Sequence, residues 1–199
     1  MGKLDLDDVA LAICEGEGGV IEGRTRLQKI AYFVTYVLSA DMAVHPGFLA
    51  HHYGPYSSAL STAAASAVVR GVLHETTEVF SSGAFLGHDM AQRRYAYRVT
   101  PRGEKAVNVR RQRAGDAYER AVNIAQQIKQ TAADYRVLSY AAKAHYVLRQ
   151  EGKAITRQAI LHRATTLGWD LRPDELEAGV EFLRKLELVT EDDSKQGSP

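Results

Sequence analysis

The spacing of apolar residues predicts two helices near the start of the chain. Apolar positions three and four residues apart predict a short helix over residues 5–15, with Asp5 or Asp7 as its N-cap. After a glycine-rich break, a second apolar stripe predicts a longer helix over residues 24–40. The buried face of this second helix would comprise Leu27, Ile30, Ala31, Val34, Val37 and Leu38.

Polar residues at the start of the second helix have candidate structural roles. Thr25 would be its N-cap, and Gln28, three residues later, would complete a capping box. Arg26 and Lys29 share one face by their i, i+3 spacing. They would either be solvated charges, with Glu22 as a pairing partner, or hold a defined place in the fold.

A Gly-Pro pair at 54–55 separates the second helix from a third one. Residues 48–53 predict a short strand before this turn. Ser57 or Ser58 would cap the third helix, which runs to about residue 69. It is built largely from alanine and serine, so it can approach another surface closely.

A strand pair and a long helix follow. Residues 72–80 and 94–100 predict an antiparallel pair joined by a loop over 81–89. Pro101 begins a long helix that runs to about Thr131 and is interrupted or bent near Gly115. A helix of about thirty residues is about 45 Å long, more than one small domain covers. Part of its apolar face is therefore expected to pack on a second subunit. That face comprises Val107, Tyr118, Val122 and Ile128.

The remaining chain predicts a second, helical unit. Its helices are expected over residues 137–150, 156–167 and 173–186. The domains are then a winged-helix-like domain with a long connecting helix over 1–132, a helix-turn-helix-like unit over 133–190, and a disordered polar tail over 191–199.

The order of helix, turn, helix and two-stranded wing predicts a winged helix-turn-helix followed by a long helix. The fold class is mainly α with a small antiparallel β wing (α+β). Its motifs read GRTRLQK, YGPYS and YRVTPRGE in chain order. In these motifs the chain resembles the YwgA-like family of bacterial and archaeal proteins, and it is more distantly similar to the Panacea antitoxin domain. The resemblance covers about residues 5–150. It implies a winged-helix-like fold and a regulatory or antitoxin-type role, and it brings no catalytic residues.

Composition narrows the function classes. The 199 residues are 45% hydrophobic and 25% charged, with a net charge of +1, so the chain as a whole is not a basic nucleic-acid binder. Its one cysteine, Cys14, lies in an apolar run and is expected in the core, which excludes an internal disulfide. No signal peptide or membrane span is predicted, so a cytoplasmic location is expected.

One segment is strongly basic. Residues 91–113 contain eight Lys and Arg against a single acid, Glu104, a local net charge of +7. Arginine suits bidentate contact with phosphate, so this segment is interpreted as a phosphate-facing surface. The alternative is a solvated face paired with acids from elsewhere in the chain. The candidate nucleic-acid-binding residues are Arg70, Arg93, Arg94, Arg98, Arg102, Lys105, Arg110 and Arg111.

The third helix would be the recognition helix, yet it lacks the side chains that read bases. Residues 57–69 contain no Lys, Arg, Asn or Gln. The possible groove-facing residues are Ser57, Ser58, Ser61 and Thr62. This helix would therefore bind the duplex through the DNA backbone and the shape of the DNA, or it would pack on a protein.

The sequence shows no catalytic or metal-binding pattern. Its seven histidines have no ligand spacing, and no nucleophile elbow, phosphate loop or dinucleotide fingerprint is present. Neither an enzyme nor a cofactor is expected. The expected function is DNA binding in a transcriptional or defence-system regulator, as a homodimer that contacts duplex through the Arg-rich wing and helix. The alternative is an antitoxin-like or adaptor protein that binds a protein partner and no DNA. No membrane partner is expected.

Overall fold

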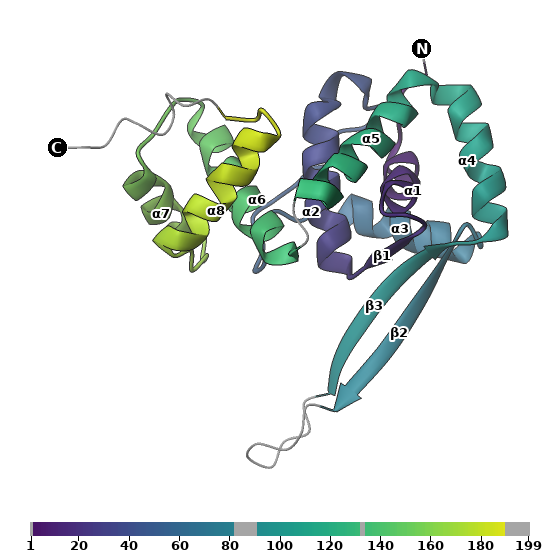
Figure 1. Cartoon of the computed structure of the whole chain (residues 1–199), viewed down its shortest axis with the longest axis horizontal. Helices are drawn as coiled ribbons and strands as arrows, with labels where there is room; N and C mark the ends of the chain where they lie inside the picture. The colour runs from purple at the N-terminus through teal and green to yellow at the C-terminus, as the bar shows by residue number, and fades with distance from the viewer. Residues whose placement is uncertain (1, 82–90, 132–133, 190–199) are drawn as a thin grey trace.

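A computed structural model describes residues 2–81, 91–131 and 134–189 of the chain (Figure 1). Within these ranges the fold is mainly helical, with one small antiparallel sheet, as predicted. The elements in chain order are α1 (Leu6–Gly16), β1 (Val20–Glu22), α2 (Arg24–Val37), the short 3-10 helix η1 (Ser39–Asp41), α3 (Ser58–Val69), β2 (Leu73–Ser81), β3 (Ala91–Val99), α4 (Pro101–Ala114), α5 (Asp116–Thr131), α6 (Tyr135–Glu151), α7 (Arg157–Thr166) and α8 (Pro173–Lys185).

The sheet has the strand order β1-β3-β2, and both pairings are antiparallel. The predicted pair of strands is confirmed as the β2–β3 hairpin, in register from Leu73 opposite Val99 to Ser81 opposite Ala91. The β1 strand has only three residues and covers only the base of the hairpin. The rest of the hairpin projects away from the helices (Figure 1).

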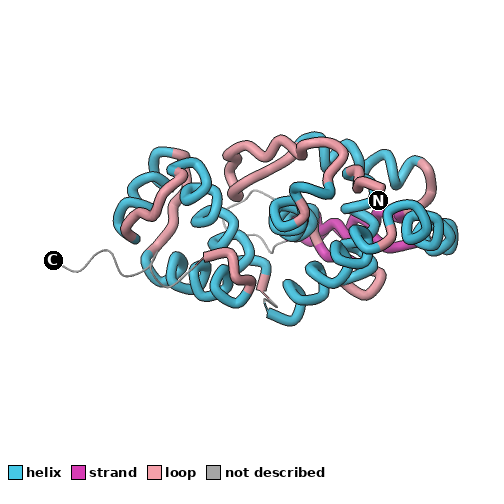
Figure 2. The backbone as a smooth tube through the Cα atoms, turned by 90° about the horizontal axis from the view of Figure 1, so that it is seen from above, coloured by secondary structure: helices cyan, strands magenta, loops and turns pink. Residues whose placement is uncertain are grey.

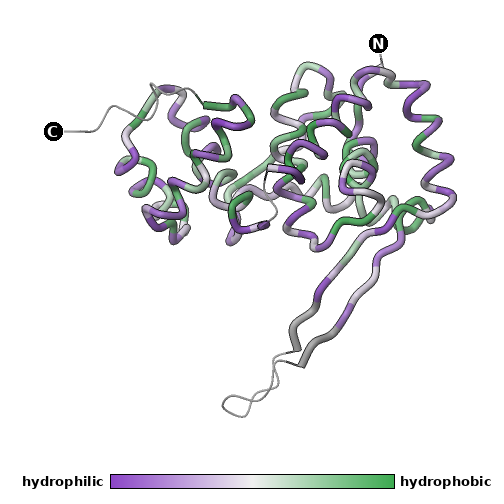
Figure 3. Tube along the Cα trace, in the orientation of Figure 1, coloured by the Kyte–Doolittle hydropathy of each residue, from purple (hydrophilic) through white to green (hydrophobic). Residues whose placement is uncertain are grey.

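Helix α1 lies in the middle of the N-terminal helices. It is buried on nearly every side, and the helices α2, α3 and α5 surround it (Figure 1). Asp5, one of the two predicted N-caps, caps α1 and forms a capping box with Asp8, and Cys14 is fully buried as expected. Figure 3 shows the hydrophobic residues gathered around α1 and hydrophilic residues along much of α4.

The long helix over residues 101–131 is interrupted at Gly115, as one of the two predicted alternatives had it, and forms two helices. Gly115, with φ 52° and ψ −123°, ends α4, and α5 turns back to pack across α1 (Figure 1). The residues proposed for the dimer surface are consequently buried within the chain: Val107, Tyr118, Val122 and Ile128. That prediction is wrong, because the apolar face of α5 belongs to the core of this chain.

The predicted strand over residues 48–53 is also wrong. Leu49 and Tyr56 form an isolated bridge through two backbone hydrogen bonds of 3.0 and 2.9 Å. The ladder cannot continue inward, because Gly54 and Pro55 reverse the chain between them and Pro55 has no N–H to donate. The predicted tail over 191–199 lies outside the described residues.

The C-terminal helices α6, α7 and α8 form a group beside the N-terminal helices (Figure 2). Helix α6 packs on α2, and the ring of Phe33 on α2 lies 5.4 Å from the ring of Phe182 on α8. The buried Tyr32 hydroxyl and His145 Nδ1 share a hydrogen bond of 2.9 Å. The two groups of helices therefore share one hydrophobic core. None of the described helices is both long enough and apolar enough to cross a membrane.

Candidate nucleic-acid interface

The junction between β3 and α4 is hydrogen-bonded to the turn that follows α3. The Thr100 hydroxyl caps α4 by accepting from the Gly103 N–H at 3.0 Å, and it donates to the Gly71 carbonyl at 2.6 Å. The Thr100 N–H donates to the Val72 carbonyl at 3.2 Å. A Cβ on Gly103 would lie 2.3 Å from the Val72 carbonyl oxygen, so only glycine fits there. The Thr-Pro-Arg-Gly sequence thus fixes the start of α4 against the end of α3.

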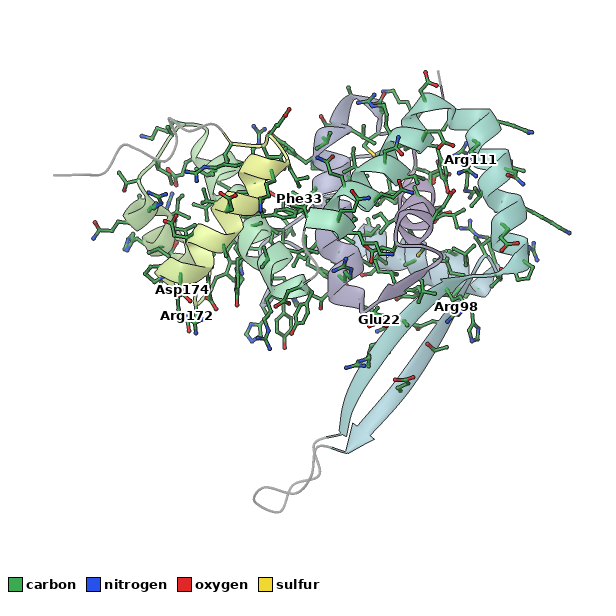
Figure 4. All side chains as sticks on the ribbon, viewed as in Figure 1. Glu22, Phe33, Arg98, Arg111, Arg172 and Asp174 are labelled. Carbon is green, nitrogen blue, oxygen red and sulfur yellow. The ribbon has the colours of Figure 1, made fainter. Side chains whose placement is uncertain are left out.

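Four predicted phosphate-binding residues surround this junction, and we call them the junction surface: Arg70, Arg98, Arg102 and Lys105. Arg70 is the C-cap of α3, Arg98 is next to the end of β3, and the other two lie in the first turns of α4. All four are exposed. Arg98 lies at the base of the hairpin (Figure 4).

Three members of the junction surface have no carboxylate partner among the described residues: Arg98, Arg102 and Lys105. Arg70 pairs with Asp7 at 2.5 Å, and the Arg70 side chain remains 46% exposed. The junction surface therefore carries positive charge that the described part of the fold leaves largely uncompensated.

The second half of the basic segment is different. Arg110 lies 3.0 Å from the fully buried Asp8 carboxylate, and Arg113 pairs with Asp8 and with Asp5. Arg111 pairs with Glu15 on α1 and Glu119 on α5. The local charge of +7 is thus partly neutralised by acids of α1 and α5. The prediction that Arg110 and Arg111 face phosphate is wrong, because both are engaged inside the chain.

The two remaining candidates lie on the β3 strand. Arg94 is exposed and stands opposite Glu78 in the register of the hairpin. Arg93 stands opposite Val79, and its side chain lies outside the described ones.

Two of the four serine and threonine candidates on α3 serve the fold instead of a groove. Ser57 is fully buried; its hydroxyl donates to the Pro46 carbonyl at 2.5 Å and caps α3 by accepting from the Leu60 N–H at 3.1 Å. The half-buried Ser61 hydroxyl accepts from the Gln28 amide at 2.9 Å. The prediction that these two serines face a groove is therefore wrong.

The outward face of α3 is neutral. Ser58, Ala59, Thr62 and Ala65 are exposed on it, and Val69 at its end is 87% exposed. None of these side chains can form the bidentate contacts that distinguish base pairs. This face offers shape and apolar area, with no means of reading a sequence.

The beginning of α2 holds the turn before α3. The Gln28 side chain donates to the Ser57 carbonyl and accepts from the Ser57 N–H, both at 2.9 Å. The predicted capping box is absent, because Gly23, with φ 95°, is the N-cap. Arg26 pairs in bidentate fashion with Glu17, at 2.8 and 2.9 Å, and not with Glu22, which was its partner in the solvated alternative.

Lys29 is the buried cation under the turn. The residue as a whole is 2% exposed, and its ammonium donates to the Pro55 carbonyl at 2.7 Å. It makes no ion pair within the described part of the chain. Burial, and secondarily repulsion from Lys143, lowers the pKa of Lys29 to about 7. The LQK and YGPYS motifs are therefore joined by direct hydrogen bonds, which gives Lys29 a defined place in the fold.

Comparison of the chain with protein-family models gives no match, and comparison with curated proteins gives none either. The resemblance to the YwgA-like family therefore stays a prediction from the motifs. Among the described residues, no three His, Cys, Asp or Glu side chains are grouped closely enough to hold a metal ion.

Proposed function

We propose that residues 1–132 form a winged-helix domain that binds the sugar–phosphate backbone of duplex DNA through the junction surface. In this proposal α3 is the recognition helix and the β2–β3 hairpin is the wing. The element order α1-β1-α2-α3-β2-β3 and the strand order β1-β3-β2 are compatible with that fold. The observation that carries the functional proposal is a set of exposed cations that pair with no carboxylate of the described residues: Arg98, Arg102 and Lys105.

The same geometry favours backbone contacts over base contacts. Arg and Lys side chains bind phosphate irrespective of sequence, and the outward face of α3 has no residue suited to base edges. Binding through this surface would depend strongly on salt and weakly on sequence. A role in regulation would then draw its specificity from DNA shape or from a partner.

Fluorescence anisotropy with a mixed-sequence duplex at several salt concentrations tests this proposal. The double variant Arg98→Gln/Arg102→Gln should bind more weakly, and the slope of log affinity against log salt should flatten by about 0.9 per lost contact. The matched control Arg136→Gln/Lys153→Gln removes the same charge from exposed residues of the C-terminal unit and should bind like the parent. A parent protein with no affinity tighter than roughly 100 µM at low salt would overturn the proposal.

A second candidate function is an antitoxin-like or adaptor protein that binds a protein partner. The neutral outward face of α3 favours it, because Val69 is 87% exposed there and small residues permit close approach. Once a partner is isolated, Val69→Lys should prevent association, whereas Arg98→Gln/Arg102→Gln should not. The reverse pattern would favour the nucleic-acid interface.

A further inference from the structure

A cavity of about 450 Å³ lies where α2, the segment from Ser39 to Phe48 and α6 meet. It is separate from the junction surface and lies between the two groups of helices. Its volume falls in the range of ordinary small-molecule sites. Its walls are largely aromatic and apolar: Tyr32, Tyr36, Met42, Phe48 and Tyr146.

The aromatic walls are held in place by their own packing. The rings of Tyr32 and Phe48 lie 5.2 Å apart and almost perpendicular. Tyr32 also contacts His145 edge-to-face at 5.6 Å, in addition to their hydrogen bond. Tyr146 packs on Trp169, with the ring centroids 5.6 Å apart. Tyr32 and Tyr146 are thus held by residues outside the lining, and Phe48 packs on Tyr32, so the aromatic walls are preformed for an apolar group.

One cation stands at this cavity without a carboxylate partner in the described chain. The Arg149 guanidinium lies 5.0 Å from the centroid of the Tyr36 ring, and its side chain is exposed. His145 lies behind the wall formed by Tyr32. Burial, and then the charge of Arg149, lowers the pKa of His145 to about 4, so His145 is neutral near pH 7. His145 does not line the cavity, and the exposed His45 does.

We propose that this cavity binds a small aromatic carboxylate, with its ring against Tyr36 and Phe48 and its carboxylate on Arg149. A guanidinium can donate two parallel hydrogen bonds to a carboxylate, which fixes the orientation of the ligand. The aromatic walls bury its ring. Since the cavity is lined by both α2 and α6, a bound ligand would stabilise the contact between the two groups of helices.

Isothermal titration calorimetry with 2-naphthoate, and with the neutral 2-naphthamide as the matched probe, tests the proposal. The parent should bind the carboxylate more tightly than the amide. Arg149→Gln should weaken the binding of 2-naphthoate by about tenfold, equivalent to about 1.4 kcal/mol, and leave the affinity for 2-naphthamide unchanged. The control Arg136→Gln, an exposed arginine of the same helix, should behave like the parent.

Tyr36→Ala should weaken the binding of both probes, because it removes a wall that the ring of each probe contacts. The proposal is overturned if the parent binds neither probe at millimolar concentration, if both probes bind it equally, or if Arg149→Gln leaves 2-naphthoate unchanged. Arg149 is exposed, so its replacement tests the site even if Tyr36→Ala fails to fold.

Discussion

Single side chains under the Gly-Pro turn decide how α2 and α3 meet. Lys29 and Gln28 each bond to backbone groups of residues 55–57, so the turn is fastened to α2 by side chains. The sequence indicated a defined place for Lys29, through its position in the LQK motif, and it could not show what that place was. A lysine on a helix surface is normally solvated, and only the tertiary fold buries this one.

The buried amine of Lys29 predicts a distinct pH dependence. Its pKa is about 7 in the folded chain and about 10.4 when unfolded, so the unfolded chain binds more protons between these values. The contribution of Lys29 to the free energy of unfolding therefore rises as the pH increases from about 7 towards 10. Below pH about 7 this contribution no longer changes with pH. Urea unfolding of parent and Lys29→Met should show this rise as a difference of up to about 1.4 kcal/mol per pH unit.

Lys153→Met, at an exposed position, is the control for that experiment and should follow the parent. Identical pH slopes for the parent and Lys29→Met would show that the Lys29 amine titrates as a solvated one.

At the scale of elements, ion pairs attach α4 to α1. The Asp8 side chain is fully buried, because α1 lies in the centre of the fold. The basic segment was visible in the sequence, as were the acids of α1. Their pairing depends on how two elements a hundred residues apart are placed, which periodicity does not report. The neutralising alternative was therefore correct for Arg110 and Arg111.

Asp8→Ala should destabilise the chain by about 2–3 kcal/mol, because it leaves the half-buried Arg110 without its partner. The estimate lies below that for a fully buried pair, since the other partner, Arg113, is 49% exposed. Asp7→Ala is the matched control and should cost less than about 1 kcal/mol. Equal losses for the two variants in chemical denaturation would contradict the assignment of Asp8 as the buried partner.

The start of α4 depends on Gly103. A Cβ at this position would collide with the Val72 carbonyl, and backbone atoms cannot move aside easily. Gly103→Ala should therefore lower stability by about 1–3 kcal/mol, and the same variant should weaken duplex binding because the junction surface is displaced. Asn108→Ala, exposed on the same helix, should do neither. An unchanged melting temperature for Gly103→Ala would contradict the close packing.

At the scale of the whole molecule, the chain holds two groups of helices on one core. Helix spacing predicted both groups of helices. It did not predict that Phe33 and His145 would join them, because apolar residues on one face of a helix do not identify their partner. The dimer surface expected on the long helix was wrong for the same reason. Its apolar face had a partner within the chain.

The shared core predicts cooperative unfolding. Differential scanning calorimetry should give a single transition. Phe33→Ala should lower the temperature of this transition, because it weakens the contact with Phe182. Val37→Ala, at an exposed position of the same helix, should leave the transition temperature nearly unchanged. Two separate transitions in the parent would show that the C-terminal helices unfold independently.

The junction surface is the proposed nucleic-acid interface, and backbone amide NMR with a titrated mixed-sequence duplex tests this assignment most directly. We predict that the largest shift changes fall on residues 70–74 and 98–105, where α3, β2, β3 and α4 meet. The α7 and α8 helices should be unaffected. Changes confined to the outward face of α3 or to the C-terminal helices, or no changes with duplex in excess at low salt, would contradict the account.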